Sequence, residues 1–371
     1  MISLNNVILF ILFAFSGVYY KDILVKPSYI SVIISCFIVF VLALKKLSIK
    51  APKTLFTLLL LLVVYTIIVQ LYFSGEVAIT VFFISIILIP FISSALKNSN
   101  NKRRIVFLSY LCLVIYYSIE AYLRIKYPDY SHLPKEGGSD AITSIFYIYK
   151  INSIAFEDSN FVSVILVIYY IGLRISHVYT SLNIKWVRLL EIYLLFLIVM
   201  TFSRSAYVGV FLFEILRIIF FRKKNAVFIK LMSVVLAVFV TPLLIYTFIL
   251  LSENDVSFLS KFHIIDLAYS YIINADASDI LFGIGFGNSV NVLGMGAHNI
   301  IVALLIENGL FGVSLYLLVL TYIAIRYRLT ILLIVPITVM GLSFSQIAMP
   351  YFYVFIAWII YIDDERKLTS C

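Results

Sequence analysis

Long runs of apolar residues follow one another along the chain, separated by short polar segments. A helix needs roughly 17 to 25 mostly apolar residues to cross the hydrocarbon of a bilayer. The pattern predicts eleven or twelve such helices, in the ranges 5–20, 28–44, 55–73, 77–96, 105–123, 160–176, 186–202, 205–221, 227–251, 297–325, 331–347 and 350–362. We therefore expect an all-α, polytopic transmembrane bundle that forms one integral membrane domain over residues 1–371.

The composition agrees with this class of protein. Hydrophobic residues make up 63% of the chain and charged residues 13%, with a mean hydropathy of +1.09. Soluble domains are typically about 45–50% apolar and about 25% charged. The net charge of +9 comes from basic residues in short loops, so it does not predict nucleic-acid binding. The three cysteines, Cys36, Cys112 and Cys371, suggest neither a disulfide framework nor a metal site.

The basic residues also predict the orientation, because short loops rich in Lys and Arg stay in the cytoplasm. With the N-terminus inside, 20 of the 28 basic residues fall on the inner side. Two longer loops then lie outside, at residues 124–159 and 252–296. The second carries an amphipathic segment, LSKFHIIDLAYSYII, which fits a helix lying flat on the membrane.

Two acidic residues inside predicted helices have basic neighbours three positions away. Glu191 follows Arg188, and Glu214 precedes Arg217. Residues at this spacing are neighbours on a helix surface. We interpret both as local ion pairs.

The first segment with candidate functional residues is TFSRSAYVG, a polar break between two apolar runs on the predicted outer side. Arg204 offers the planar, bidentate donors that suit a phosphate, and Ser203 and Ser205 add hydroxyls beside it. A helix-end arginine that reaches toward water is the alternative interpretation.

A glycine-rich segment, GIGFGN, contains Gly283, Gly285 and Gly287. Successive backbone N–H groups in such a segment can converge on an anion, although a plain turn is equally consistent with it. A nucleotide-binding loop is excluded, because that motif requires a preceding strand in a β-α-β unit.

The segment HNIIVALLIENGLFG places polar groups at the start of a predicted helix. If the helix is continuous, Gly309 and Gly312 return to the face of His298, whereas Glu307 points roughly the opposite way. His298, followed by Asn299, is either a satisfied polar group or a base at the outer end of the helix. Because ionisable groups near the bilayer tend to have a function, we favour the base.

In this order, TFSRSAYVG, a long outer loop, LFGIGFGNS, and AHN followed after nine residues by GLFG resemble the O-antigen ligase and polymerase superfamily of bacterial envelopes. The resemblance covers residues 195–325. It implies an inverting glycosyltransferase without metal or cofactor, which uses undecaprenyl-diphosphate-linked glycan at the periplasmic face of the inner membrane. A chain-length regulator protein is a further partner that it implies.

The resemblance also implies roles for individual residues. Arg204 corresponds to the arginine that would hold the diphosphate, and His298 to the histidine near the reaction centre. Lys261 stands where the family commonly has a second arginine, and a lysine lacks the bidentate fork. The remaining candidates for substrate contact are Ser203, Ser205, His263, Asn299 and Glu307.

A lipid diphosphate is already a good leaving group, so cations at Arg204 and Lys261 need only neutralise developing charge. Neutral His298 is placed to take the proton of the acceptor hydroxyl. The length and composition favour a polymerase, which extends a lipid-linked repeat, over a ligase, which transfers glycan to lipid A core. A lipid-oligosaccharide flippase or transporter is disfavoured, because the chain lacks internal repeats.

Overall fold

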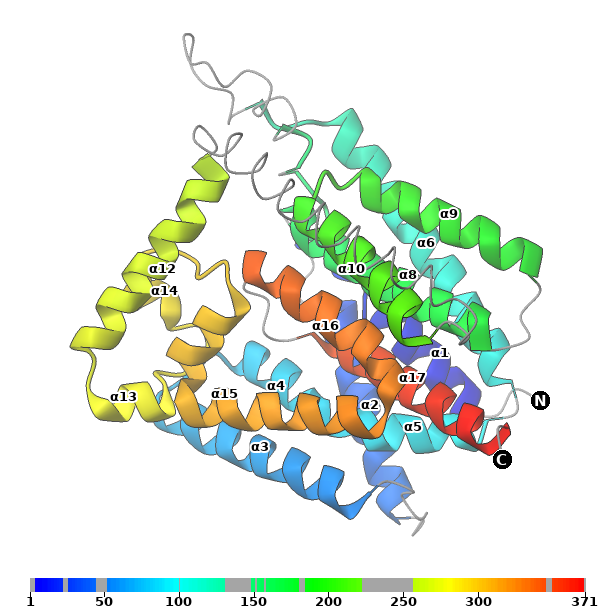
Figure 1. Ribbon diagram of the computed structural model, residues 1–371, viewed down its shortest axis with the longest axis horizontal. Coiled ribbons are helices and arrows are strands. Elements are labelled where there is room, and N and C mark those ends of the chain that lie inside the picture. The colour runs from blue at the N-terminus through cyan, green and yellow to red at the C-terminus, as the bar shows by residue number, and fades with distance from the viewer. Residues whose placement is uncertain are drawn as a thin grey trace.

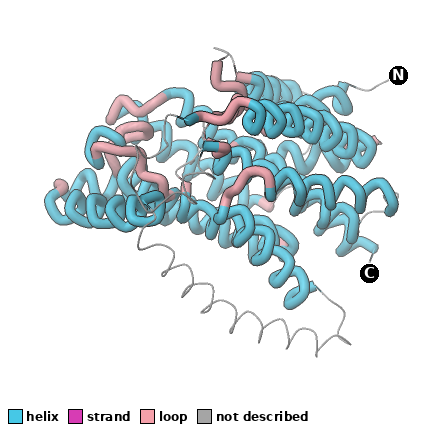
Figure 2. The backbone as a smooth tube through the Cα atoms, turned by 90° about the horizontal axis from the view of Figure 1, so that it is seen from above, coloured by secondary structure: helices cyan, strands magenta, loops and turns pink. Residues whose placement is uncertain are grey.

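The computed structural model is helical and contains no strand in the residues that it describes, and Figure 2 shows these helices joined by short loops. The described residues are 4–22, 26–44, 52–99, 101–130, 148–150, 152–156, 158–179, 184–221, 256–344 and 349–369. The α-helices are labelled in Figure 1. The helical elements are α1 (Leu4–Phe15), α2 (Pro27–Leu44), α3 (Lys53–Tyr72), α4 (Val77–Ile84), η1 (Ser85–Leu88), α5 (Ile89–Lys97), α6 (Lys102–Lys126), α8 (Ser159–Tyr179), α9 (Ile184–Val199), α10 (Arg204–Phe221), α12 (Val256–Asn274), α13 (Ala277–Phe282), α14 (Ser289–Leu293), α15 (Ile300–Arg326), η4 (Arg328–Thr330), α16 (Ile331–Met340), η5 (Gly341–Ser343) and α17 (Pro350–Thr369).

Each predicted apolar run within the described residues contains a helix, whereas α12, α13 and α14 lie in the predicted loop 252–296. The predicted all-α class is confirmed for the described residues. The predicted helix at 227–251 lies outside the described residues. The run at 77–96 forms α4, η1 and α5 in succession, and the run at 331–347 leaves helical structure after Ser343. The amphipathic segment of the second long loop forms α12.

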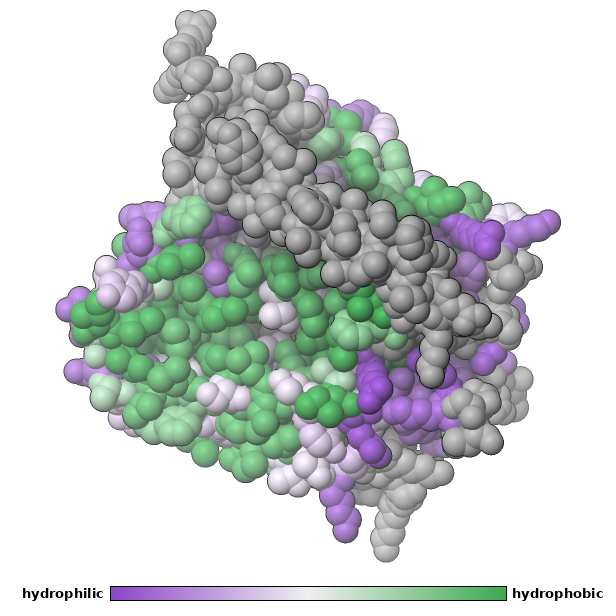
Figure 3. Space-filling view, viewed as in Figure 1, coloured by the Kyte–Doolittle hydropathy of each residue, from purple (hydrophilic) through white to green (hydrophobic). Residues whose placement is uncertain are grey.

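Five of the described helical segments are long and apolar enough to cross a membrane. They are Lys53–Tyr72, Val77–Lys97, Lys102–Lys126, Ser159–Val178 and Ile300–Arg326. Large apolar side chains on α3 and α15, such as Leu71 and Ile325, remain exposed, and the face in Figure 3 is mostly hydrophobic over these helices. Soluble proteins rarely expose such wide apolar surfaces, so these faces and the five apolar helices are compatible with a multi-pass membrane protein.

The core of the bundle lies around α8 and α17. Trp358 of α17 is fully buried, and its Nε1 donates to Ser176 Oγ of α8 at 2.8 Å. Phe13 of α1 packs edge-on against Trp358, with ring centroids 5.8 Å apart. These contacts satisfy the indole N–H inside an apolar interior, where an unpaired donor would be costly.

A polar network ties α8, α9 and α10 together. Glu191 pairs with two residues of α8, Arg174 at 2.8 Å and His177 at 2.7 Å. It is therefore bound between helices, in place of the local pair with Arg188 that the spacing predicted. The other local pair is confirmed, since Glu214 lies 2.5 Å from Arg217.

Candidate functional site

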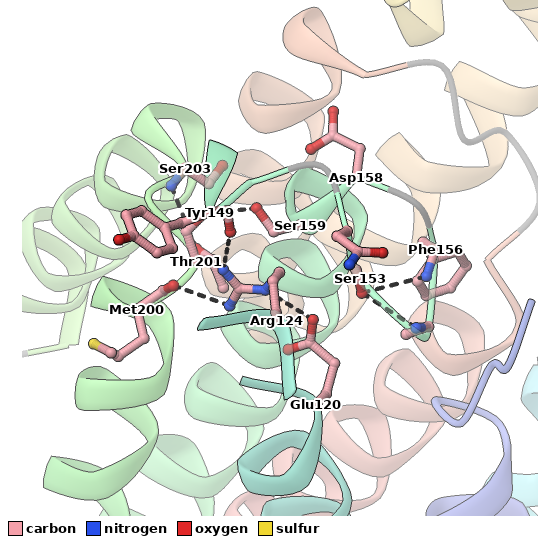
Figure 4. Close-up of polar contacts among 12 residues, drawn as sticks. Glu120, Arg124, Tyr149, Ser153, Phe156, Asp158, Ser159, Met200, Thr201 and Ser203 are labelled. Atoms are coloured by element: carbon pink, nitrogen blue, oxygen red, sulfur yellow. Dashed lines mark hydrogen bonds and ion pairs between the residues drawn. The ribbon is translucent and has the colours of Figure 1, made fainter. Parts of the chain in front are cut away.

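Arg204 is the first residue of α10. It follows a tight turn from α9, in which Figure 4 labels Met200, Thr201 and Ser203. Phe202 in this turn has a φ of 53°, in the left-handed region that bulky residues rarely adopt. Ser203 is fully buried, and its Oγ bonds to Asn160 Oδ1 at 2.8 Å and to Ser205 Oγ at 3.0 Å. Arg204 itself is exposed. The two serines therefore support the turn, and the arginine projects from it.

His298 lies just before α15 and is exposed. Its φ is 38°, again in the left-handed region. Asn299 is the N-cap of α15, because its Oδ1 accepts from the backbone N–H of Ile301 at 2.9 Å and of Val302 at 3.3 Å. The capping bond fixes the start of the helix, so the backbone that carries the imidazole is held in place. A contact of Asn299 with substrate stays a prediction.

The helix after His298 is not continuous, because α15 is broken at Gly309, so the shared face of His298, Gly309 and Gly312 does not follow. This glycine has φ 64° and ψ 178° inside the helix. Two backbone carbonyls just before the break accept hydrogen bonds from backbone N–H groups of the glycine-rich segment. Ile284 N donates to Ile306 O at 2.9 Å, and Gly285 N donates to Glu307 O at 3.0 Å.

Tyr65 of α3 satisfies the next carbonyl of the break, with its hydroxyl 2.9 Å from Asn308 O. A Cβ on Gly283 would lie 2.6 Å from the backbone N of Asn308. The two glycine motifs of the sequence, GIGFG and NGLFG, thus form one junction at which backbone packs on backbone.

The polar group that the glycine-rich segment contacts is a carboxyl group of the protein itself. The Glu307 carboxylate accepts from Ser289 Oγ at 2.5 Å and from Ser289 N at 3.4 Å, and it interacts with the Gly287 N–H. Glu307 is only 4% exposed. The Glu307 side chain therefore bonds the segment that ends at Ser289 to α15. Substrate binding by Glu307 stays a prediction.

Two candidate residues lie on α12, which stands beside α14 and the first half of α15 (Figure 1). Lys261 Nζ donates to Ser343 Oγ at 3.1 Å. His263 is exposed. Farther along the helix, burial raises the pKa of Tyr271, and the nearby Asp279 and Asp276 raise it further. Tyr271 therefore stays neutral in ordinary buffers.

The end of α16 brings these separate segments together. Ile300, two residues after His298, packs on Gly341, and Lys261 bonds to Ser343. Phe344 lies against Phe161 of α8, with ring centroids 6.4 Å apart. Asn160, the residue before Phe161, bonds to Ser203, the residue before Arg204. Gly209 of α10 packs on Met340. The segments that carry Arg204, Lys261 and His298 therefore meet around Met340–Phe344.

Ser343 and Asn160 are not among the site residues predicted from the sequence. The signal for Ser343 is the polar interruption GLSFSQ in the last but one apolar run. Asn160 follows Asp158, whose carboxylate accepts from the Asn160 N–H at 2.8 Å, so it occupies the first turn of α8. Neither sequence pattern identifies the residue to which the side chain bonds, which is Lys261 for Ser343 and Ser203 for Asn160.

In the part of the chain that the structure describes, no three His, Cys, Asp or Glu side chains gather as a metal site would require. Comparison with known proteins gives no further assignment: no family model matches the chain, and no curated protein matches it.

Proposed function

We propose that this protein is a membrane-embedded glycosyltransferase that polymerises oligosaccharide repeat units carried on undecaprenyl diphosphate. The motif order TFSRSAYVG, LFGIGFGNS and AHN supports the reaction class through its resemblance to the O-antigen ligase and polymerase superfamily. The main structural support for the proposal is that the segments with Arg204, Lys261 and His298 meet around Met340–Phe344. Arg204 and His298 are 94 positions apart along the chain.

The three side chains have complementary tasks in glycosyl transfer. In the reaction, the acceptor hydroxyl oxygen bonds to the anomeric carbon of the donor while the bond from that carbon to the diphosphate breaks. Arg204 receives the departing diphosphate with a bidentate fork, and Lys261 adds a second positive charge. His298 takes the proton of the hydroxyl and later releases it to water. Attack opposite the leaving group inverts the anomeric configuration.

The fixed backbone around these residues favours catalysis. Charges that are already oriented toward the leaving group need no reorganisation during the reaction. The turn before Arg204 is bonded to α8, and the start of α15 is capped by Asn299. In the proposed arrangement the site faces the periplasm, and the lipid chains of both substrates stay in the inner membrane.

Surface glycan from a deletion strain tests the function and separates it from its alternatives. A polymerase predicts core carrying a single repeat unit in place of a ladder. Absent surface glycan, with polymer retained on its lipid carrier, would identify a ligase. Repeat units held at the cytoplasmic face, with polymerisation restored by a known flippase, would identify a transporter and contradict the proposal.

A further inference from the structure

Arg124 and Glu120 form a fully buried ion pair near the end of α6. Their side chains are 0% and 1% exposed, and Arg124 Nε lies 2.9 Å from Glu120 Oε1. Two charges taken out of water are costly unless the remaining donors also find partners. The guanidinium of Arg124 meets this demand with two backbone carbonyls.

These carbonyls belong to two different segments, as Figure 4 shows. Nη1 donates to Tyr149 O at 2.6 Å, and Nη2 donates to Met200 O at 3.0 Å. Arg124 therefore joins α6, residues 148–150 and the turn between α9 and α10. A lysine has no planar fork to reach all three acceptors at once.

Met200 is the first residue of the turn that precedes Arg204. The next carbonyl, Thr201 O, accepts from Ser159 Oγ at 2.7 Å, and Phe202 then takes its positive φ. Ser203 completes the turn through its bond to Asn160. The backbone ahead of Arg204 is thus held from both sides, by the charged Arg124 at one end and by the first turn of α8 at the other.

We infer that Arg124, neutralised by Glu120, is a positioning residue that sets the direction of Arg204 in the site. This inference rests on the proposed function, since it assigns Arg204 a diphosphate to bind. Arg124 is buried, so it acts through the carbonyl of Met200 and does not touch substrate. A displacement of about 1 Å at a reacting group can lower a rate on the order of 100-fold.

The test must separate positioning from simple loss of stability. Arg124→Met alone leaves the Glu120 carboxylate buried and unpaired, so it is expected to fold poorly. The double substitution Glu120→Leu with Arg124→Met removes both charges, and apolar replacement of a buried pair often preserves stability. The matched control removes a remote pair, Lys97→Met with Asp364→Leu, which lie 2.7 Å apart at the other end of the bundle.

For the double variant at Glu120 and Arg124, we expect a folded protein whose kcat for chain extension is about 100-fold lower, with KM for the lipid donor changing far less. Backbone amides from 201 to 206 should exchange with deuterium faster than in the wild type. The control variant should match the wild type in both measurements. Wild-type kcat, or unchanged exchange in this turn, would overturn the inference.

A third substitution and the wild type make the outcomes distinguishable. Arg124→Lys keeps the positive charge. We still expect its kcat to be as low as that of the double variant, because a lysine cannot bond to both Tyr149 O and Met200 O. If the wild type forms no glycosidic bond, the proposed function fails, and the exchange measurement still decides whether Arg124 orders the turn. If the double variant does not fold, exchange of Arg124→Lys in the same turn decides it.

Discussion

At the residue scale, two of the three strained non-glycine backbone positions among the described residues lie in the candidate site. Three non-glycine residues have a positive φ in the described part of the chain: Ser74, Phe202 and His298. Phe202 lies two positions before Arg204, and His298 is itself a candidate. Such conformations persist only where the surroundings impose them, and they concentrate at functional sites. The strain therefore adds an argument for these two segments that is independent of their motifs.

His298 offers a way to separate backbone strain from chemistry. Asparagine tolerates a positive φ but provides no base, so His298→Asn should fold like the wild type and lose chain extension. His298→Val should lose extension and also about 1–2 kcal/mol of stability, because a β-branched residue fits this backbone poorly. Thermal unfolding in detergent, measured beside extension, checks both statements. Extension by His298→Asn at the wild-type rate would remove the proposed base.

The sequence identified the polar residues of the site better than their partners. Arg204 and His298 stand out because polar groups are rare in so apolar a chain. The cap at Asn299 could also have been predicted, since an asparagine before an apolar run is a common helix start. The burial of Glu307 against Ser289 could not, because it depends on residues 18 positions apart that fold onto each other.

At the scale of elements, the positions of the helices followed from hydropathy, and the break in α15 did not. Nothing in NGLFG alone distinguishes a continuous helix from a broken one. The break becomes stable because Ile284 and Gly285 supply backbone donors to the carbonyls it exposes, and Gly283 lets the two backbones approach. This is tertiary packing, which local periodicity does not encode.

The junction between the two glycine motifs can be tested with a matched pair of substitutions. Gly283 and Gly294 both have a positive φ, 82° and 69°. A Cβ at Gly283 would lie 2.6 Å from backbone atoms of Glu307 and Asn308, whereas a Cβ at Gly294 would meet nothing within 4 Å. Gly294→Ala should therefore cost only the backbone strain, about 1–2 kcal/mol.

Gly283→Ala should in addition separate the glycine-rich segment from α15, so little folded protein is expected in detergent extracts. Size-exclusion profiles and unfolding temperatures of the two variants give the comparison. Equal stability of the two variants would show that the junction does not hold α15.

At the scale of the whole molecule, the ion pairs of α17 and the candidate site lie at different ends of the bundle. Ion pairs between α17 and the turn from α5 to α6 gather at one end, where Asp364 pairs with Lys97 and Glu365 with Lys102. The segments with Arg204, Lys261 and His298 meet at the end of α16. The distribution of basic residues predicts that the first end is cytoplasmic and the second is outside.

Cysteine labelling tests this orientation. In a background without the native cysteines, Ser278→Cys at the start of α13 should react with an impermeant maleimide when applied to spheroplasts. Arg328→Cys, in the short link after α15, should react only after the membrane is permeabilised. Both positions are exposed. Labelling of the two from the same side would contradict the predicted topology.

Glycosyl transfer at this site can be tested by chain extension with the purified protein in liposomes that contain lipid-diphosphate-linked repeat units. We expect a product ladder from the wild type and from the remote control Arg328→Ala. Arg204→Ala and His298→Ala should each reduce extension on the order of 100-fold or more while remaining folded, because each removes a preorganised group from the transition state. A wild-type ladder from either of these two variants, or no glycosidic bond formed by the wild type, would contradict glycosyl transfer at this site.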